Sequence, residues 1–169
     1  MFKRIHWRQY LPFAIIAAIV YCIPVLFFLR DANYTQSWLL FLGNLLFLFC
    51  IVSFLFYFNK KRHENASSVT MVAAGLITTL LGIATALITC IILLIVIIPG
   101  LLHAGAAGKV LINAPANTIQ GKTNGLVFEV IADVLVGNFS AGIFASILFP
   151  FTIKGDQTKE STSKKENEL

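Results

Sequence analysis

Two acidic residues, Glu129 and Asp133, stand inside a long apolar stretch of this 169-residue sequence. They are four positions apart, so on a helix they lie one turn apart on the same face. Carboxyl groups are costly to place inside a membrane, and there they commonly mark ion or proton pathways. Counting back about 20 residues from Phe151 places the outer edge of the hydrocarbon region near Ala132. We therefore expect Asp133 at this edge and Glu129 one turn outside it.

This acidic pair has two interpretations. In the first, both carboxyl groups lie in the wetted first turns of a helix, where the helix dipole favours acids. In the second, Asp133 faces other helices and joins polar groups at a similar depth. The second interpretation gives a candidate polar cluster of Asn44, Thr85, Thr89, Glu129, Asp133 and Asn138. Such a cluster suits a proton, a small cation or an ordered water, although Asn and Thr also form simple hydrogen bonds between helices.

No other residue pattern indicates catalysis or a bound metal. The cysteines Cys22, Cys50 and Cys90 lie in separate apolar runs without a CxxC motif, so the sequence predicts neither a redox pair nor a zinc site. We expect them to pack as small apolar residues. The histidines are isolated from one another (His6, His63 and His103). The sequence predicts no enzyme, no catalytic residue, no cofactor and no metal.

The elements that carry these residues are membrane helices. Hydrophobic residues make up 57% of the chain and charged residues 12%, and the mean hydropathy is +0.82. Soluble domains contain about 25% charged residues. We predict an all-α, integral membrane four-helix bundle that occupies residues 1–153 and is surrounded by the lipid bilayer. Its spans are expected at about 11–29, 38–58, 69–98 and 126–151.

The third span has a row of small residues that lets another helix approach closely. Small residues recur on the fourth span, inward from Asp133 and beside Asn138 and Ser146, so we expect these two spans to make the closest contact. The predicted packing residues are Gly75, Thr78, Gly82 and Thr85 on the third span, and Gly137, Ala141, Gly142 and Ala145 on the fourth. The same groove is equally suited to docking a second copy of the chain.

The second span is rich in aromatic residues and has few small ones, which predicts a helix that faces lipid over much of its circumference. The longest connector, 101–125, contains Pro, Gly and short apolar runs. This composition is compatible with a path along the outer surface and with a segment that dips back into the membrane.

The net charge of +5 and the pI of about 9.3 do not indicate nucleic-acid binding, because the basic residues lie in short segments between apolar runs. All Lys and Arg residues except Arg30, Lys109 and Lys122 lie in the N-terminal segment, the 59–68 loop or the tail 154–169. The positive-inside rule then places both termini in the cytoplasm. The tail is expected to be disordered because it has little to bury.

Two function classes remain compatible with this sequence. The first is a non-enzymatic accessory or scaffolding membrane subunit that acts through helix packing with itself or with a membrane protein partner. The second is a small oligomeric channel or transporter for a proton, ion or small solute, centred on Asp133. The composition is similar to that of small inner-membrane proteins of bacteria, which predicts this location.

Overall fold

The structure is a computed structural model that describes residues 7–61, 67–98, 111–113 and 125–166. Within these residues it is helical, without a strand. Its elements are α1 (Trp7–Asp31), the 3-10 turn η1 (Tyr34–Gln36), α2 (Trp38–Lys61), α3 (Ser68–Ile97), α4 (Gly125–Ala132), the π-helical turn η2 (Asp133–Gly137) and α5 (Asn138–Glu166). The last three elements follow one another without a break and form the fourth rod.

In the part of the chain that the structure describes, four helices are long and apolar enough to cross a membrane, as the sequence predicts. These candidate spans are Gln9–Asp31, Tyr34–Lys60, Ser68–Ile97 and Gly125–Thr152. They include every residue of the predicted spans except Ile98, the last residue predicted for the third span. The third span begins with a side-chain cap, in which Ser67 Oγ accepts a hydrogen bond of 3.2 Å from the backbone N–H of Thr70.

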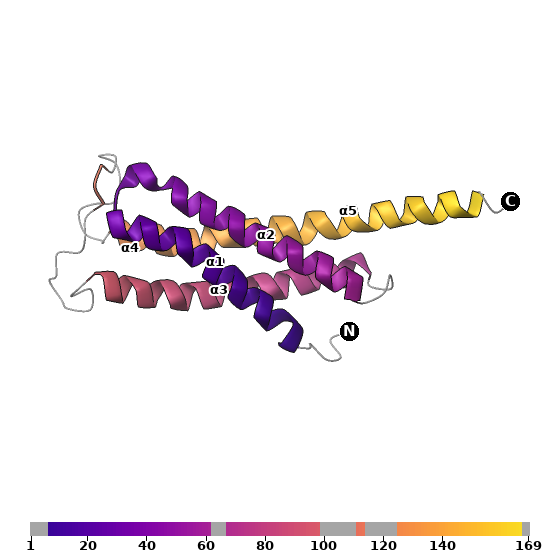
Figure 1. The fold of residues 1–169 in the computed structure, drawn as a ribbon, viewed down its shortest axis with the longest axis horizontal. Helices are drawn as coiled ribbons and strands as arrows, with labels where there is room; N and C mark the ends of the chain where they lie inside the picture. Colours follow the sequence, from indigo (N-terminus) through magenta and orange to yellow (C-terminus); the bar gives the residue numbers. More distant parts are fainter. Residues whose placement is uncertain (1–6, 62–66, 99–110, 114–124, 167–169) are drawn as a thin grey trace.

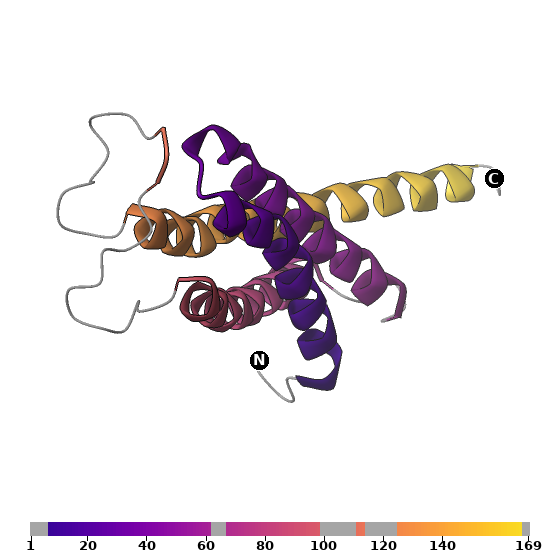
Figure 2. The ribbon, with the colours of Figure 1, turned by 60° about the vertical axis from the view of Figure 1, so that its left-hand side comes forward.

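Successive rods run in opposite directions (Figure 1). The starts of α2 and α4 lie at one end of the bundle, which we call the connector end; the start of α1, the start of α3 and the end of α5 lie toward the other, which we call the terminal end. Figure 2 shows α1 crossing the other helices obliquely. The segments between α1 and α2 and between α2 and α3 are short, which favours antiparallel neighbours.

Both α1 and the fourth rod pack along α3. The predicted contact between the third and fourth spans is therefore present, but α1 contacts α3 as extensively. The reason lies in Ala14, Ala17 and Ala18, which are fully buried and recur at helical spacing on one side of α1. These small side chains let α1 approach α3 closely.

The aromatic residues of α2 divide between two faces. Phe47, Phe54 and Phe58 are buried, and Tyr10 of α1 packs edge-on against Phe54 with ring centroids 5.7 Å apart. The outward face includes Phe41, which is 71% exposed. The second helix thus fills the core with one aromatic face and leaves the other exposed.

A short part of the longest connector joins the turn between α1 and α2. The backbone N–H of Tyr34 donates to the carbonyl of Ile112, and the N–H of Ile112 donates to the carbonyl of Ala32, each at 2.9 Å. Leu111 is buried beneath this bridge and Ile112 is exposed. Most of 101–125 lies outside the described residues, so the structure does not choose between its two predicted paths.

The helix α5 continues to Glu166, beyond the other helices, whereas we predicted a disordered tail from 154 (Figure 1). The helix is favoured for two reasons. Glu160 and Lys164 are spaced for a favourable i, i+4 pair. An existing helix also extends more easily than a new one nucleates.

Candidate functional site

Asp133 is the centre of a hydrogen-bonded network between helices. Tyr21 of α1 donates its hydroxyl to Asp133 Oδ2, and Asn44 of α2 donates its amide to Asp133 Oδ1, both at 2.7 Å. The Asp133 side chain is half-buried, whereas Tyr21 is fully buried. One carboxyl group of the fourth rod therefore connects to two other helices. We call these three residues the Asp133 network.

The backbone around Asp133 departs from a regular α-helix. The N–H of Asn138 donates to the carbonyl of Asp133, five residues back, which defines the wider π-helical turn η2. Such turns are frequent at functional sites. Gly137 closes this turn, and a Cβ there would lie 2.5 Å from Asn44 Nδ2 and 2.8 Å from Asp133 Oδ1. Glycine at 137 therefore leaves the space that Asn44 needs to reach the carboxyl group.

A second glycine positions Tyr21. A Cβ at Gly43 would lie 3.0 Å from Cδ2 of the Tyr21 ring and 3.2 Å from the Tyr21 carbonyl oxygen. The backbones of α1 and α2 consequently approach each other beside the ring. Glycine at 43 therefore leaves the space that the Tyr21 ring occupies while its hydroxyl donates to Asp133.

Both donors to Asp133 are neutral groups. Among the described residues, no Lys, Arg or His side chain forms an ion pair with this carboxyl group. Carboxyl groups within membrane helices usually pair with another group, because a carboxylate is costly to place there. Neutral hydrogen bonds stabilise a carboxylate without cancelling its charge. A proton or a cation at Asp133 would cancel it.

The structure brings together only part of the predicted polar cluster. Asn44 and Asp133 are in contact, and Asn138 is fully buried one π-turn further along. The hydroxyls of Thr85 and Thr89 donate to carbonyls of their own helix, at 2.8 and 2.9 Å. Glu129 is half-buried and forms no hydrogen bond with the described residues.

The sequence analysis did not identify Tyr21 as part of this site. Its one available signal was the phenolic hydroxyl itself, because a buried tyrosine usually finds a hydrogen-bond partner. The cysteines lie in separate apolar runs, and their spacing predicts no contact between them. Cys22 and Cys90 are in fact in contact across α1 and α3, with their Sγ atoms 3.8 Å apart, and both are free thiols. The described residues contain no group of three or more His, Cys, Asp or Glu that could hold a metal.

Glycines on α3 and α5 mark the contact between these helices. A Cβ at Gly75 would lie 2.6 Å from Ser146 Oγ, and a Cβ at Gly142 would lie 2.1 Å from Thr79 Cγ2. The α5 residues that face inward are Asn138, Gly142, Ala145 and Ser146, whereas Gly137 and Ala141 are half-exposed. Of the predicted packing residues on the fourth rod, Gly142 and Ala145 thus face inward and Gly137 adjoins Asn44, whereas Ala141 does not lie in the contact.

The remaining predicted packing residues of α3 are also occupied within the chain. A Cβ at Gly82 would lie 2.9 Å from the ring of Phe47, and the buried Thr78 donates to the Ala74 carbonyl at 2.9 Å. Thr85 is half-exposed. The groove that we considered for a second copy is therefore filled by this chain's own helices.

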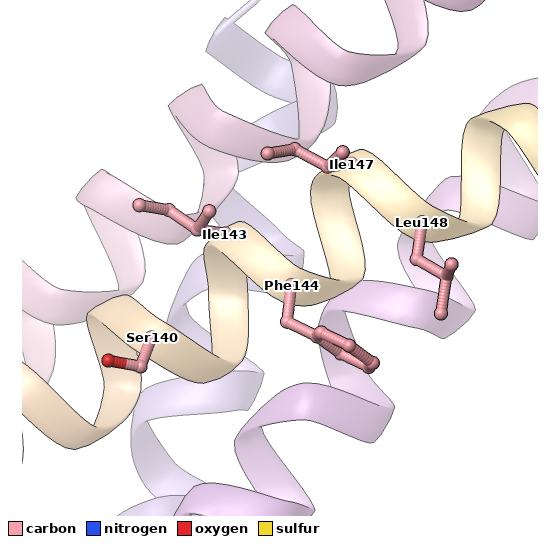
Figure 3. Close-up of a pocket in the computed structure, with 5 residues that line it drawn as sticks. All are labelled: Ser140, Ile143, Phe144, Ile147 and Leu148. Atoms are coloured by element: carbon pink, nitrogen blue, oxygen red, sulfur yellow. The ribbon is translucent and has the colours of Figure 1, made fainter.

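A separate hollow of about 380 Å³ lies on the outward side of α5 (Figure 3). It is lined by Ser140, Ile143, Phe144, Ile147 and Leu148, all from this one helix. Ser140 supplies its polar group, and the other four side chains are apolar. The hollow contains none of the residues of the Asp133 network.

No protein-family model, no curated protein and no solved structure matches this chain.

Proposed function

We propose that this chain is a non-enzymatic membrane protein that binds a proton or small cation at Asp133 and moves it as part of a channel or transporter. One observation carries the proposal: Asp133 accepts hydrogen bonds from two other helices, and both donors are neutral. Intramembrane carboxyl groups placed in this way are typical of ion and proton pathways.

The geometry suggests how occupancy of Asp133 acts on the protein. Each carboxylate oxygen accepts one hydrogen bond from the chain and keeps further acceptor capacity. A proton or cation would use that capacity and weaken the hold on Tyr21 and Asn44. Loading and unloading of Asp133 would then loosen and tighten the contacts of α1 and α2 with η2.

We further propose an oligomer in the inner membrane of a bacterium, with both termini in the cytoplasm. The charge distribution along the sequence supports this orientation. The small number of helices supports assembly, because the core of one copy is filled and a path through it needs helices to separate. In this orientation Asp133 is near the outer side of the membrane.

Asp133→Asn is expected to reduce proton uptake by at least about tenfold, because it removes the titratable group of the pathway. Asparagine keeps the size of the side chain and can still accept the hydrogen bond from Tyr21. The measurement uses the full chain in liposomes that contain a trapped pH-sensitive dye, with uptake driven by a potassium diffusion potential. A parallel assay with labelled Na⁺ distinguishes a cation from a proton.

Glu129→Gln is the matched control, since it removes a carboxyl group one turn away that has no partner among the described residues. It should leave uptake within about twofold of the wild type. Equal uptake by the wild type and Asp133→Asn contradicts the proposal. So does a wild type that takes up neither protons nor Na⁺ faster than empty liposomes.

An accessory or scaffolding subunit is the second candidate, and the hollow on α5 supports it. Its lining residues recur at the spacing of a single helix face, and Phe144 is 56% exposed. A helix from another membrane protein would fit along such a face. This arrangement would leave the inward packing of α3 and α5 unchanged.

A photo-reactive phenylalanine analogue at position 144 tests this second function in intact membranes. A partner helix in the hollow is expected to give a discrete protein adduct, because the reactive ring would lie against it. The same analogue at Phe41, 71% exposed on α2, is the control and should react only with lipid. Lipid adducts at both positions would remove the support that the hollow gives.

A further inference from the structure

The contact between α3 and α5 contains buried polar groups without partners. Asn138, Thr79 and Ser146 are each at most 1% exposed. Neither amide atom of Asn138 has a hydrogen-bond partner, nor has Thr79 Oγ1 or Ser146 Oγ. Buried polar groups in proteins almost always have partners, so an exception needs an explanation. We call these three residues, together with Gly75 beside Ser146 and Gly142 beside Thr79, the α3–α5 seam.

Neighbouring threonines show that these hydroxyls have an alternative. Thr78 donates to the carbonyl of Ala74, and Thr85 donates to the carbonyl of Leu81. Thr79 lies beside Thr78 on the same helix, yet its hydroxyl lies against Gly142 instead. Ser146 likewise directs its hydroxyl at Gly75. Both hydroxyl groups thus face the opposite helix.

The seam continues the Asp133 network toward the terminal end of the bundle. Asn138 follows Asp133 by one π-turn, and Ser146 lies two α-turns beyond Asn138. At about 1.5 Å per residue, the row from Asp133 to Ser146 is about 20 Å long. This length is a large part of the roughly 30 Å hydrocarbon core. In the present structure the glycine contacts keep the row closed.

We propose that the α3–α5 seam is the inner half of the pathway, closed in this structure and filled by water when α3 and α5 separate. The proposal rests on the proposed function of Asp133. The closed state leaves the amide of Asn138 and the hydroxyls of Thr79 and Ser146 without partners, and entering water would supply them. Hydrogen-bonded water would then connect Asp133 to the solution at the terminal end.

Labelling of an introduced cysteine tests whether water enters the seam. In liposomes, Ser146→Cys should react with a positively charged methanethiosulfonate reagent at least about tenfold faster than Ile147→Cys, because the reaction needs a hydrated thiolate. Position 147 is the matched control, since it is the next residue and its side chain is 48% exposed on the lipid side. The wild type, with its three buried or half-buried cysteines, gives the baseline. Equal rates at positions 146 and 147 would overturn the proposal.

A valine pair tests whether the seam carries the proton. Thr79→Val should slow Asp133-dependent uptake by about tenfold, because it breaks the hydrogen-bonded row without changing the side-chain shape. Thr78→Val should not slow it, since the Thr78 hydroxyl already bonds within α3. Equal uptake by the two variants would overturn the route and leave the role of Asp133 standing. Absence of Asp133-dependent uptake in the wild type would overturn both.

Discussion

Replacing Phe47 by alanine is expected to lower the free energy of unfolding by about 3–5 kcal/mol. The Phe47 ring is fully buried and lies against Gly82 of α3, so no neighbouring side chain can expand into the space it leaves. The loss of packing contacts matters most in a membrane, where lipid provides little hydrophobic drive for helix association. The change in the free energy of unfolding is measured by reversible unfolding in mixed micelles, in which the fraction of a denaturing detergent is raised stepwise.

Phe41→Ala is the control for this prediction. It removes the same ring from the same helix, but the Phe41 side chain is 71% exposed and faces away from the core. Its effect should stay within about 0.5 kcal/mol, as for most surface substitutions. Similar losses at positions 41 and 47 would show that α2 does not have the orientation described here.

Gly142→Ala is expected to lower the free energy of unfolding by about 1–3 kcal/mol, as overpacking of a tight core does. The new Cβ would overlap Thr79 Cγ2 at 2.1 Å and Thr79 Oγ1 at 2.6 Å. In an isolated helix the same change would stabilise by about 1 kcal/mol. The expected change in the free energy of unfolding therefore has the opposite sign to that predicted by helix propensity. The same unfolding experiment in mixed micelles measures this sign.

A second substitution shows whether the clash is with Thr79. Thr79→Ala removes the two overlapping atoms, so the double variant should recover most of the stability lost in Gly142→Ala, a positive coupling between the two positions. Ser140→Ala, on the exposed side of α5, should change stability little and controls for the alanine itself. Additive effects of Gly142→Ala and Thr79→Ala would contradict the contact between α3 and α5 at this point.

The number and positions of the spans were accessible from hydropathy, because the length of an apolar run and its flanking charges are local properties. Asn44 and Asp133 were also placed in one cluster by depth alone. Depth in the membrane could not exclude Thr85 and Thr89 from this cluster. Their hydroxyls donate to backbone carbonyls of α3 instead of reaching Asp133. Two residues at one depth can face different directions, and sequence spacing sets direction only within a helix.

The contribution of Tyr21 depended on information that no single span contains. Its hydroxyl meets Asp133 only because α1 packs against both α2 and α3 at this level. The contact of Cys22 with Cys90 has the same origin. The π turn η2 also left no clear sequence signal, since it differs from an α-helix by one residue per turn.

Of the residues predicted to pack on the fourth rod, Gly142 lies against Thr79, Gly137 lies against Asn44 and Ala145 is buried, whereas Ala141 is half-exposed. A regular helix would keep Asp133, Gly137 and Ala141 on one face. The structure leaves Gly137 and Ala141 half-exposed and turns Asn138 and Gly142 inward. The buried face of α2 was hard to predict for a different reason. Aromatic residues recur around the whole helix, so their positions do not show which face is buried.

The bridge between residues 32–34 and Ile112 bears on how much these two segments can change in sequence. Its two hydrogen bonds join backbone groups of Tyr34, Ile112 and Ala32, and a third hydrogen bond, of 3.3 Å, runs from the amide of Asn113 to Asn33 Oδ1. Only the third depends on the side chains present, so a chain that differs at the exposed positions of these segments can still form the two backbone hydrogen bonds. Sequence differences in these segments would then say little about whether a related chain has the same backbone bridge.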